Sequence, residues 1–135
     1  MTSEIIYKGA LRTEAKHLQS SIIIETDAPT DNQGKGERFS PTDLLATSLG
    51  TCMITTMGIK ARNMNVDLTD TKISVQKIMK SDPRRVAKVE VIFDFPSSLK
   101  IDDKQKQILE NTAHTCPVAI SIHPDLEVKT VFNWC

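Results

Sequence analysis

The hydrophobic pattern is strongest between Ser40 and Asn63, where it predicts a long helix. Ser40 can cap free backbone N–H groups and Pro41 suits the first helical position. No charged residue occurs between Asp43 and Lys60. The large apolar side chains cover most of the helical circumference, which predicts a buried helix with Cys52 near its middle; they are Leu44, Leu45, Leu49, Met53, Ile54, Met57 and Ile59. A membrane span is not expected, because this uncharged window is short and is interrupted by Thr, Ser and Gly residues.

The segments before this helix predict strands and a loop. Residues 4–12 and 18–26 are rich in Ile and contain few breakers, which predicts a β-hairpin. Residues 27–39 concentrate Pro, Asp, Asn and Gly, which predicts a loop. Gly34, Lys35 and Gly36 in this loop lack the spacing of a phosphate-binding motif, so a flexible loop is favoured.

The segments after the helix predict two strands, a second helix and a last strand. Residues 66–80 contain spaced apolar positions, and residues 86–95 alternate apolar with charged side chains, as in a half-buried antiparallel strand. Asp102 or Asp103 opens the second helix, and its apolar stripe ends at Cys116. Pro117 disfavours helical geometry at Cys116 and suits the start of a new short turn over residues 118–122. Residues 126–134 alternate again, so the order ββ-α-ββ-α-β predicts one α+β domain over residues 1–135.

Length, charge and cysteine count limit which partners and which kinds of chemistry we expect for this protein. A chain of 135 residues is small for covering a long central helix, so a partner subunit would complete the cover. Seventeen basic and seventeen acidic side chains cancel and form no Lys/Arg-rich run, which argues against nucleic-acid binding. The first residues show no signal or transit pattern, so we expect a cytoplasmic protein. Three cysteines make a poor structural disulfide framework, so pairing between them would be redox-active or absent.

Two cysteines are the candidates for chemistry. An isolated buried cysteine such as Cys52 is most often a packing residue, and as a nucleophile it would need a cation such as Arg12 or Arg38. Cys116 is predicted at a helix N-terminus, where free N–H groups and the helix dipole stabilise a thiolate. Local physics therefore favours Cys116 as the nucleophile. His114 forms a Cys-x-His pair without further regularly spaced ligands, so no metal site is expected. The terminal Cys135 is expected to be incidental.

The contexts of these two cysteines resemble those of a known family. Residues 40–52 read S-P-T-D-L-L-A-T-S-L-G-T-C and residues 113–121 read A-H-T-C-P-V-A-I-S. Together with the element order around them, they resemble the OsmC/Ohr family of osmotically inducible and organic hydroperoxide resistance proteins, in its OsmC-like subfamily. The resemblance spans nearly the whole chain. It implies an intertwined homodimer in which the long central helices lie between antiparallel sheets made from both chains, with the active site at the subunit interface.

The resemblance implies a thiol-dependent peroxidase for organic hydroperoxides. Cys52 would attack the O–O bond and become a sulfenic acid, and Cys116 would then close a disulfide. A dithiol reductant, lipoyl-type or a small thiol, would reset the pair, and no metal or organic cofactor is implied. Family members commonly carry an acidic residue where this chain has Thr42, with Asp43 one place later, so the acidic partner that would orient the arginine stays open. Arg12 and Glu37 are ranked first as the activating pair, ahead of Asp43 and His17.

One alternative from another functional class stays open. The same cleft would hold a small apolar ligand in a non-catalytic binding protein, with Cys52 serving only as packing. The alternation of small with large residues along the helix, at Ala46, Ser48, Gly50 and Thr51, would leave room for such a ligand. The cysteine contexts favour the peroxidase over this reading.

Overall fold

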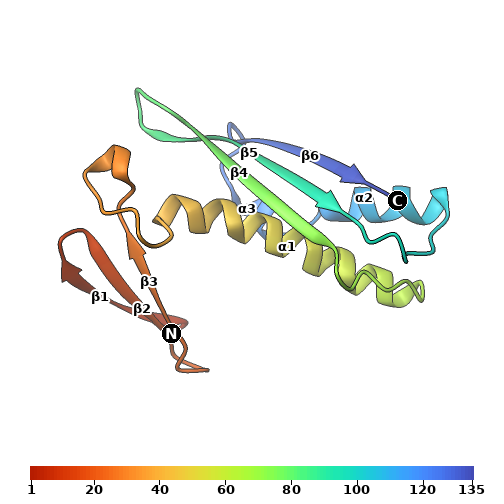
Figure 1. Ribbon diagram of the computed structural model, residues 1–135, viewed down its shortest axis with the longest axis horizontal. Helices are drawn as coiled ribbons and strands as arrows, with labels where there is room; N and C mark the ends of the chain where they lie inside the picture. Colours follow the sequence, from red (N-terminus) through yellow and green to blue (C-terminus); the bar gives the residue numbers. More distant parts are fainter. The chain divides into compact units, whose positions relative to one another are not determined.

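The computed structural model describes residues 1–135 and shows an α+β fold with two three-stranded sheets (Figure 1). The chain forms two compact units, Met1–Leu45 and Ala46–Cys135. The elements in chain order are β1 (Ser3–Gly9), β2 (Arg12–His17), β3 (Ile23–Asp27), η1 (Thr30–Asn32), α1 (Pro41–Asn63), β4 (Lys72–Lys80), β5 (Arg85–Asp94), α2 (Asp103–Ala113), α3 (Pro117–Ser121) and β6 (Glu127–Asn133). The predicted α+β class is confirmed, but the order begins with three strands rather than two.

Strands β1, β2 and β3 form an antiparallel meander in the first unit, so the prediction of a single hairpin is wrong. The chain reverses at Gly9, Ala10 and Leu11, which all have positive φ, inside the segment predicted as the first strand. A second reversal follows His17, whose N–H donates to the carbonyl of Ile22. The first turn was missed because Ala and Leu rarely adopt positive φ, so only one residue of the three signals a turn.

The loop between β3 and α1 is held by its own backbone hydrogen bonds. Gly34 N–H donates to the carbonyl of Pro29 at 3.0 Å, and Gly36 N–H donates to that of Ala28 at 3.3 Å. A Cβ atom on Gly34 would overlap the Ala28 carbonyl group, which explains the glycine there. Both glycine N–H groups are used inside the loop, so they are not arranged to cradle a phosphate.

Helix α1 starts and ends where the sequence predicts. Asp43 N–H donates to Ser40 Oγ at 3.0 Å and Ser40 N–H donates to Asp43 Oδ2 at 2.8 Å, which is a reciprocal capping box. Pro41 is the first helical residue. The helix is long and apolar enough to cross a membrane by length and composition, a property that it shares with core helices of soluble proteins.

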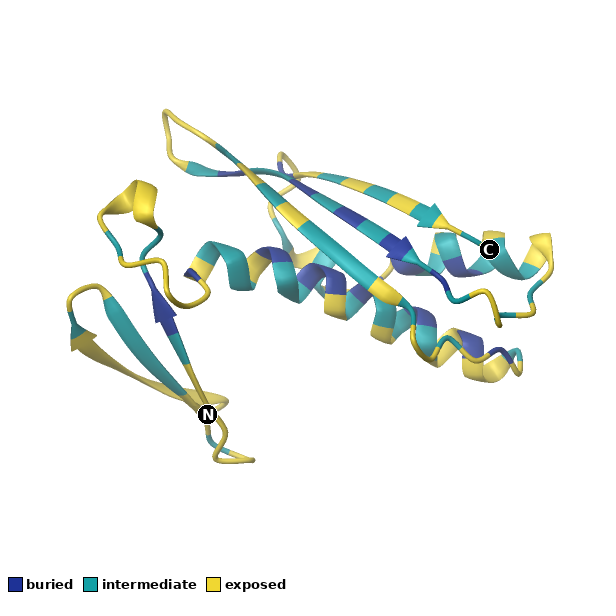
Figure 2. Ribbon diagram, viewed as in Figure 1, coloured by how far each residue is buried: buried dark blue, intermediate teal, exposed yellow.

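Only one stripe of α1 is buried within a single chain (Figure 2), so the prediction of burial all round is wrong for the isolated chain. The buried positions are Ala46, Leu49, Gly50, Met53, Met57 and Ala61. On other faces Leu45 is 40% exposed and Ile59 is 60% exposed. One chain supplies a single sheet to pack against this part of α1, which leaves the opposite face uncovered.

The second sheet has the order β4-β5-β6 and supports the core of the second unit. Strand β5 alternates as predicted, and Val89, Val91 and Phe93 are buried in one cluster with Leu49 of α1 and Leu109 of α2. Gly50 lets α1 approach the sheet, since a Cβ atom there would lie 2.6 Å from Cγ2 of Val75.

The strand pairings β1-β2, β2-β3 and β4-β5 are antiparallel as predicted, whereas β6 runs parallel to β5 and corrects the prediction there. The segment that contains α2 and α3 carries the chain from the end of β5 back to its beginning, and such a crossover joins parallel strands. The periodicity of β6 gives its buried face but not its direction, which depends on this connection.

Candidate active site

Cys52 lies in the middle of α1 and is half-buried, not fully buried as the sequence predicts. Its side chain packs against the hydrophobic core of the second unit. Cys116 is a member of that core and is completely buried. Both are free cysteines, and Cys52 is the more exposed residue of the two.

Two helix caps fix the position of Cys116. Asp102 caps α2 through a capping box with Gln105, which confirms the predicted helix start. Cys116 is itself the N-cap of α3, and Ala119 N–H donates to its Sγ at 3.4 Å. Pro117 is the first residue of α3, so the predicted break at the thiol is confirmed.

Burial raises the pKa of the Cys116 thiol above its usual value, because the apolar core disfavours the thiolate. The Ala119 N–H bond acts in the opposite direction and does not outweigh burial. The neighbouring Cys52 thiol raises the pKa of Cys116 further, so the two thiols interact in the same core. The prediction that favoured Cys116 as the nucleophile considered the helix end and left out the burial, which acts against a thiolate at Cys116.

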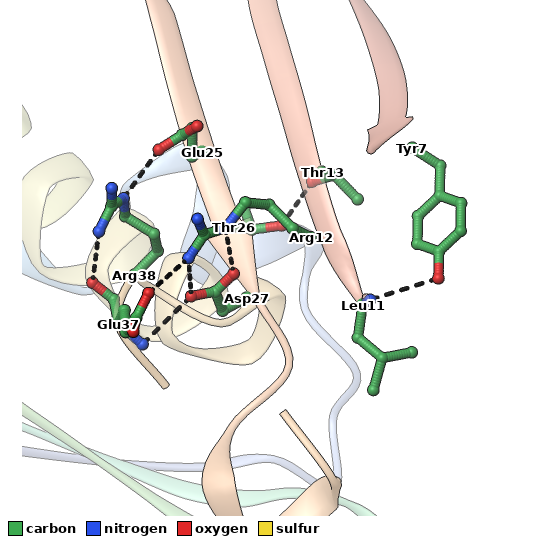
Figure 3. Close-up of polar contacts among 9 residues, drawn as sticks. All are labelled: Tyr7, Leu11, Arg12, Thr13, Glu25, Thr26, Asp27, Glu37 and Arg38. Carbon is green, nitrogen blue, oxygen red and sulfur yellow. Dashed lines mark hydrogen bonds and ion pairs between the residues drawn. The ribbon is translucent and has the colours of Figure 1, made fainter. Parts of the chain in front are cut away.

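Arg12 and Glu37, the predicted activating pair, are in direct contact in the first unit (Figure 3). Arg12 Nη2 donates to Glu37 Oε2 at 2.9 Å. Arg12 also forms a bidentate pair with Asp27, with 2.7 Å from Nε to Oδ1 and 2.8 Å from Nη2 to Oδ2. Glu37 N–H donates to Asp27 Oδ2 at 3.1 Å, which closes a ring of three residues.

Asp27 is the member of this ring that sequence reasoning missed. It is the last residue of β3 and pairs across the sheet with Arg12, the first residue of β2. The predicted hairpin placed Arg12 at the end of a strand and Asp27 in a loop. Only the correct three-strand register, with Arg12 opposite Asp27, would have revealed the pair.

The ion pairs stabilise the charged forms of both partners. The Arg12 hydrogen bonds lower the pKa of Asp27, against the opposing effect of desolvation. Hydrogen bonds to Asp27 first, and to Glu37 second, raise the pKa of Arg12. Arg12 thus remains a guanidinium and Asp27 a carboxylate at neutral pH.

The other candidate residues have separate partners. Arg38 Nε donates to Glu25 Oε2 at 2.8 Å, and Asp43 caps α1. His17 Nδ1 lies 2.6 Å from Ser20 Oγ. The thiol of Cys135 donates to the carbonyl of Phe95 at 2.7 Å.

No metal site is formed by the side chains. His114 Nε2 lies 3.2 Å from Thr130 Oγ1, and no group of three His, Cys, Asp or Glu residues could hold a metal ion.

The chain is similar in sequence and fold to proteins of one known family. The model of the OsmC-like protein family matches residues 34–131. A Psychrobacter arcticus protein, named as a putative osmotic stress induced and detoxification response protein, is 56% identical over 98% of this chain and 96% of its own, with a TM-score of 0.93. This chain belongs to the OsmC-like family.

More distant OsmC-like structures share the fold. An organic hydroperoxide resistance protein OsmC from Legionella pneumophila is 15% identical over 99% of this chain and 98% of its own, with a TM-score of 0.72. A protein from Vibrio cholerae, named as a putative organic hydroperoxide resistance protein and with captopril bound in one of its active sites, is 16% identical over 100% of this chain and 93% of its own, with a TM-score of 0.73. At such identities these two show the fold alone. No curated protein matches the chain.

Proposed function

We propose that this OsmC-like protein is a cysteine-dependent peroxidase that reduces organic hydroperoxides. The observation that carries the proposal is the pair of interacting free thiols in one core, one half-accessible at Cys52 and one buried at Cys116. One protein of the same fold is named an organic hydroperoxide resistance protein and a second is named a putative one, which supports the substrate class.

The two thiols divide the reaction between them. The Cys52 thiolate attacks one peroxide oxygen, the O–O bond breaks, and the alkoxide leaves as an alcohol after taking a proton. Cys52 is then a sulfenic acid. The Cys116 sulfur attacks the Cys52 sulfur, expels water and forms a disulfide, which a dithiol reductant of lipoyl type would reduce. Cys52 is the first nucleophile because it is the more accessible thiol, whereas the core keeps Cys116 protonated.

The role of Arg12 and Glu37 as the activating pair is part of the proposal. A cationic or hydrogen-bond-donating group is needed because burial disfavours a thiolate. Arg12 is held as a guanidinium by two carboxylates, which supports its role as that donor. Glu37 would orient the guanidinium.

We propose that the working unit is a homodimer. Sheet β1-β2-β3 and the residue before β3 expose many large apolar side chains within one chain, more than a monomer commonly leaves in contact with water. They are Ile5, Ile6, Tyr7, Ile22, Ile23 and Ile24. Ile59 of α1 is exposed as well. A second copy would cover these surfaces. Light scattering at micromolar concentration is expected to give twice the chain mass of 15.0 kDa, and a mass of 15.0 kDa would contradict the dimer.

The direct test of the function is consumption of cumene hydroperoxide. With dihydrolipoamide as reductant the wild-type protein is expected to turn over continuously, and to prefer cumene hydroperoxide to hydrogen peroxide. The preference follows from the apolar surroundings of Cys52 in the core. A protein that consumes neither peroxide with any dithiol would overturn the proposal.

A non-catalytic binding protein is the second candidate, and one observation favours it. A groove of about 770 Å³ runs along the C-terminal half of α1 and is lined in part by Ile54, Gly58, Ile59 and Leu68. Cys52 does not line this groove. If the protein only binds a ligand, Cys52→Ala should leave that binding unchanged. If it is a peroxidase, Cys52→Ala should abolish peroxide reduction.

A further inference from the structure

The first step of the proposed reaction releases an alkoxide, which is a strong base and leaves slowly unless it receives a proton. In the second step Cys116 attacks as a thiolate, although burial raises the pKa of its thiol. A proton must therefore reach the alkoxide, and a proton must leave Cys116, both beside the sulfur of Cys52. One proton transfer from Cys116 to the alkoxide would meet both needs.

The Cys116 thiol lies beside the Cys52 thiol in the core of the second unit. The two side chains share a hydrogen bond, which raises the pKa of Cys116 and so keeps the proton on that thiol. Cys116 is 0% exposed, whereas Cys52 is half-buried and packs against the same cluster. An O–O bond is shorter than a hydrogen bond, so a peroxide in contact with Cys52 Sγ has both oxygens near the Cys116 S–H group.

No other buried side chain in the second unit carries a proton that it could donate to the alkoxide. The buried polar side chains all belong to the first unit, and they are Thr26, Asp27 and Ser40. The hydroxyl groups around Cys52 on α1 donate to helix carbonyls at 2.8 to 3.0 Å; they belong to Thr51, Thr55 and Thr56. The Cys116 S–H group is thus the buried proton donor that this core supplies to a reaction at Cys52.

We propose that the Cys116 S–H group is the general acid of the first step. The Cys52 thiolate bonds to the terminal peroxide oxygen, the O–O bond breaks, and the alkoxide oxygen takes the Cys116 proton and leaves as an alcohol. Cys116 is then a thiolate, and its sulfur accepts the Ala119 N–H, which lies at 3.4 Å. This thiolate attacks the sulfur of the Cys52 sulfenic acid, the S–S bond forms, and the S–O bond breaks to release hydroxide, which takes a proton from solvent.

The inference rests on the proposed function, because it names the source of a proton in that reaction. A transfer of this kind lets a buried thiol with a raised pKa resolve a sulfenic acid. Cys116 needs no base of its own, because an alkoxide is a stronger base than a thiolate and removes the proton. The resolving thiolate therefore forms only after a peroxide has been cleaved.

Two reactions of Cys52 in the reduced, full-length protein test this role. Oxidation by cumene hydroperoxide releases an alkoxide, whereas alkylation by iodoacetamide releases iodide, which needs no proton. Quenched-flow mass spectrometry of the Cys52 peptide gives both rates. Cys116→Ala is expected to lower the ratio of oxidation to alkylation on the order of 100-fold or more, which is the size of a general-acid contribution. The control Cys135→Ser should leave the ratio unchanged.

Cys116→Ser keeps the test decisive if Cys116→Ala does not fold, because serine is a favoured N-cap residue and suits the start of α3. Its hydroxyl is a much weaker acid than a thiol, so the ratio is expected to fall at least about 10-fold. The wild-type ratio in the folded variant would overturn the inference, whether its two rates stay the same or fall together.

Ring-substituted cumene hydroperoxides give a readout that a merely structural role of Cys116 would not change. Electron-withdrawing substituents make the alkoxide a better leaving group. They are expected to speed oxidation of the Cys116 variant more than that of the wild-type protein, because the variant has lost its proton donor. An equal dependence on the substituent in both proteins would overturn the inference.

The wild-type rates separate this inference from the function beneath it. A wild-type protein whose Cys52 is alkylated but is not oxidised by any of these hydroperoxides would overturn both the peroxidase and the general acid. Oxidation of Cys52 with the same ratio in the wild-type protein and in Cys116→Ala would overturn the general acid alone, and the peroxidase would stand.

Discussion

Replacing Cys52 with serine is expected to reduce the consumption of cumene hydroperoxide to its uncatalysed rate. A serine hydroxyl is a far weaker nucleophile than a thiolate at neutral pH, and the buried Cys116 cannot substitute because its thiol stays protonated. The Cys116→Ser variant is expected to behave differently. One equivalent of peroxide should convert Cys52 to a sulfenic acid that persists, because no second thiol in that core can resolve it.

The readouts are peroxide loss and dimedone labelling of the Cys52 peptide. Cys135→Ser is the matched control, since it removes a thiol that is exposed and bonded to the Phe95 carbonyl. This control should turn over like the wild-type protein. Residual turnover in Cys52→Ser, or dimedone labelling on Cys135 in place of Cys52, would count against the assigned roles.

Leu109→Ala is expected to lower the free energy of unfolding by roughly 2–5 kcal/mol, because it leaves a cavity in the core. Leu109 is fully buried on α2, in the same cluster as Ala113 and Cys116. The matched control is Ile120→Ala on α3, where a side chain of similar size is 72% exposed. That change should stay within about 0.5 kcal/mol.

Urea unfolding monitored by circular dichroism measures both variants. Equal and small effects would show that α2 is not packed into the core as described. The packing of α2 also matters for the proposed reaction. Helix α2 ends at Ala113, and Cys116 follows it as the N-cap of α3.

Local signals explain what could be predicted from the sequence. The bounds of α1 follow from Ser40, Pro41 and Asp43, whose capping contacts lie within three residues of each other. The position of Cys116 follows in the same way, since Pro117 alone determines that a new helix begins after the thiol. Both features depend on neighbours in the chain, so a single sequence was enough.

Long-range contacts explain what could not be predicted. Asp27 and Arg12 are fifteen positions apart, and their pairing depends on the register of β2 against β3, which follows from the chain reversal after His17. The raised pKa of Cys116 depends on burial under residues from several elements. The hydrophobic periodicity could not predict the exposed face of α1 either. That exposure depends on how much of the helix surface a single chain can pack against.

The most direct test of the peroxidase account is the identity of the disulfide formed by peroxide. The reduced protein is treated with one equivalent of cumene hydroperoxide per chain, alkylated, digested without reductant and analysed by mass spectrometry. The account predicts a peptide pair joined through Cys52 and Cys116, with Cys135 alkylated. Recovery of Cys52 and Cys116 as alkylated thiols, or paired only with Cys135, would contradict it.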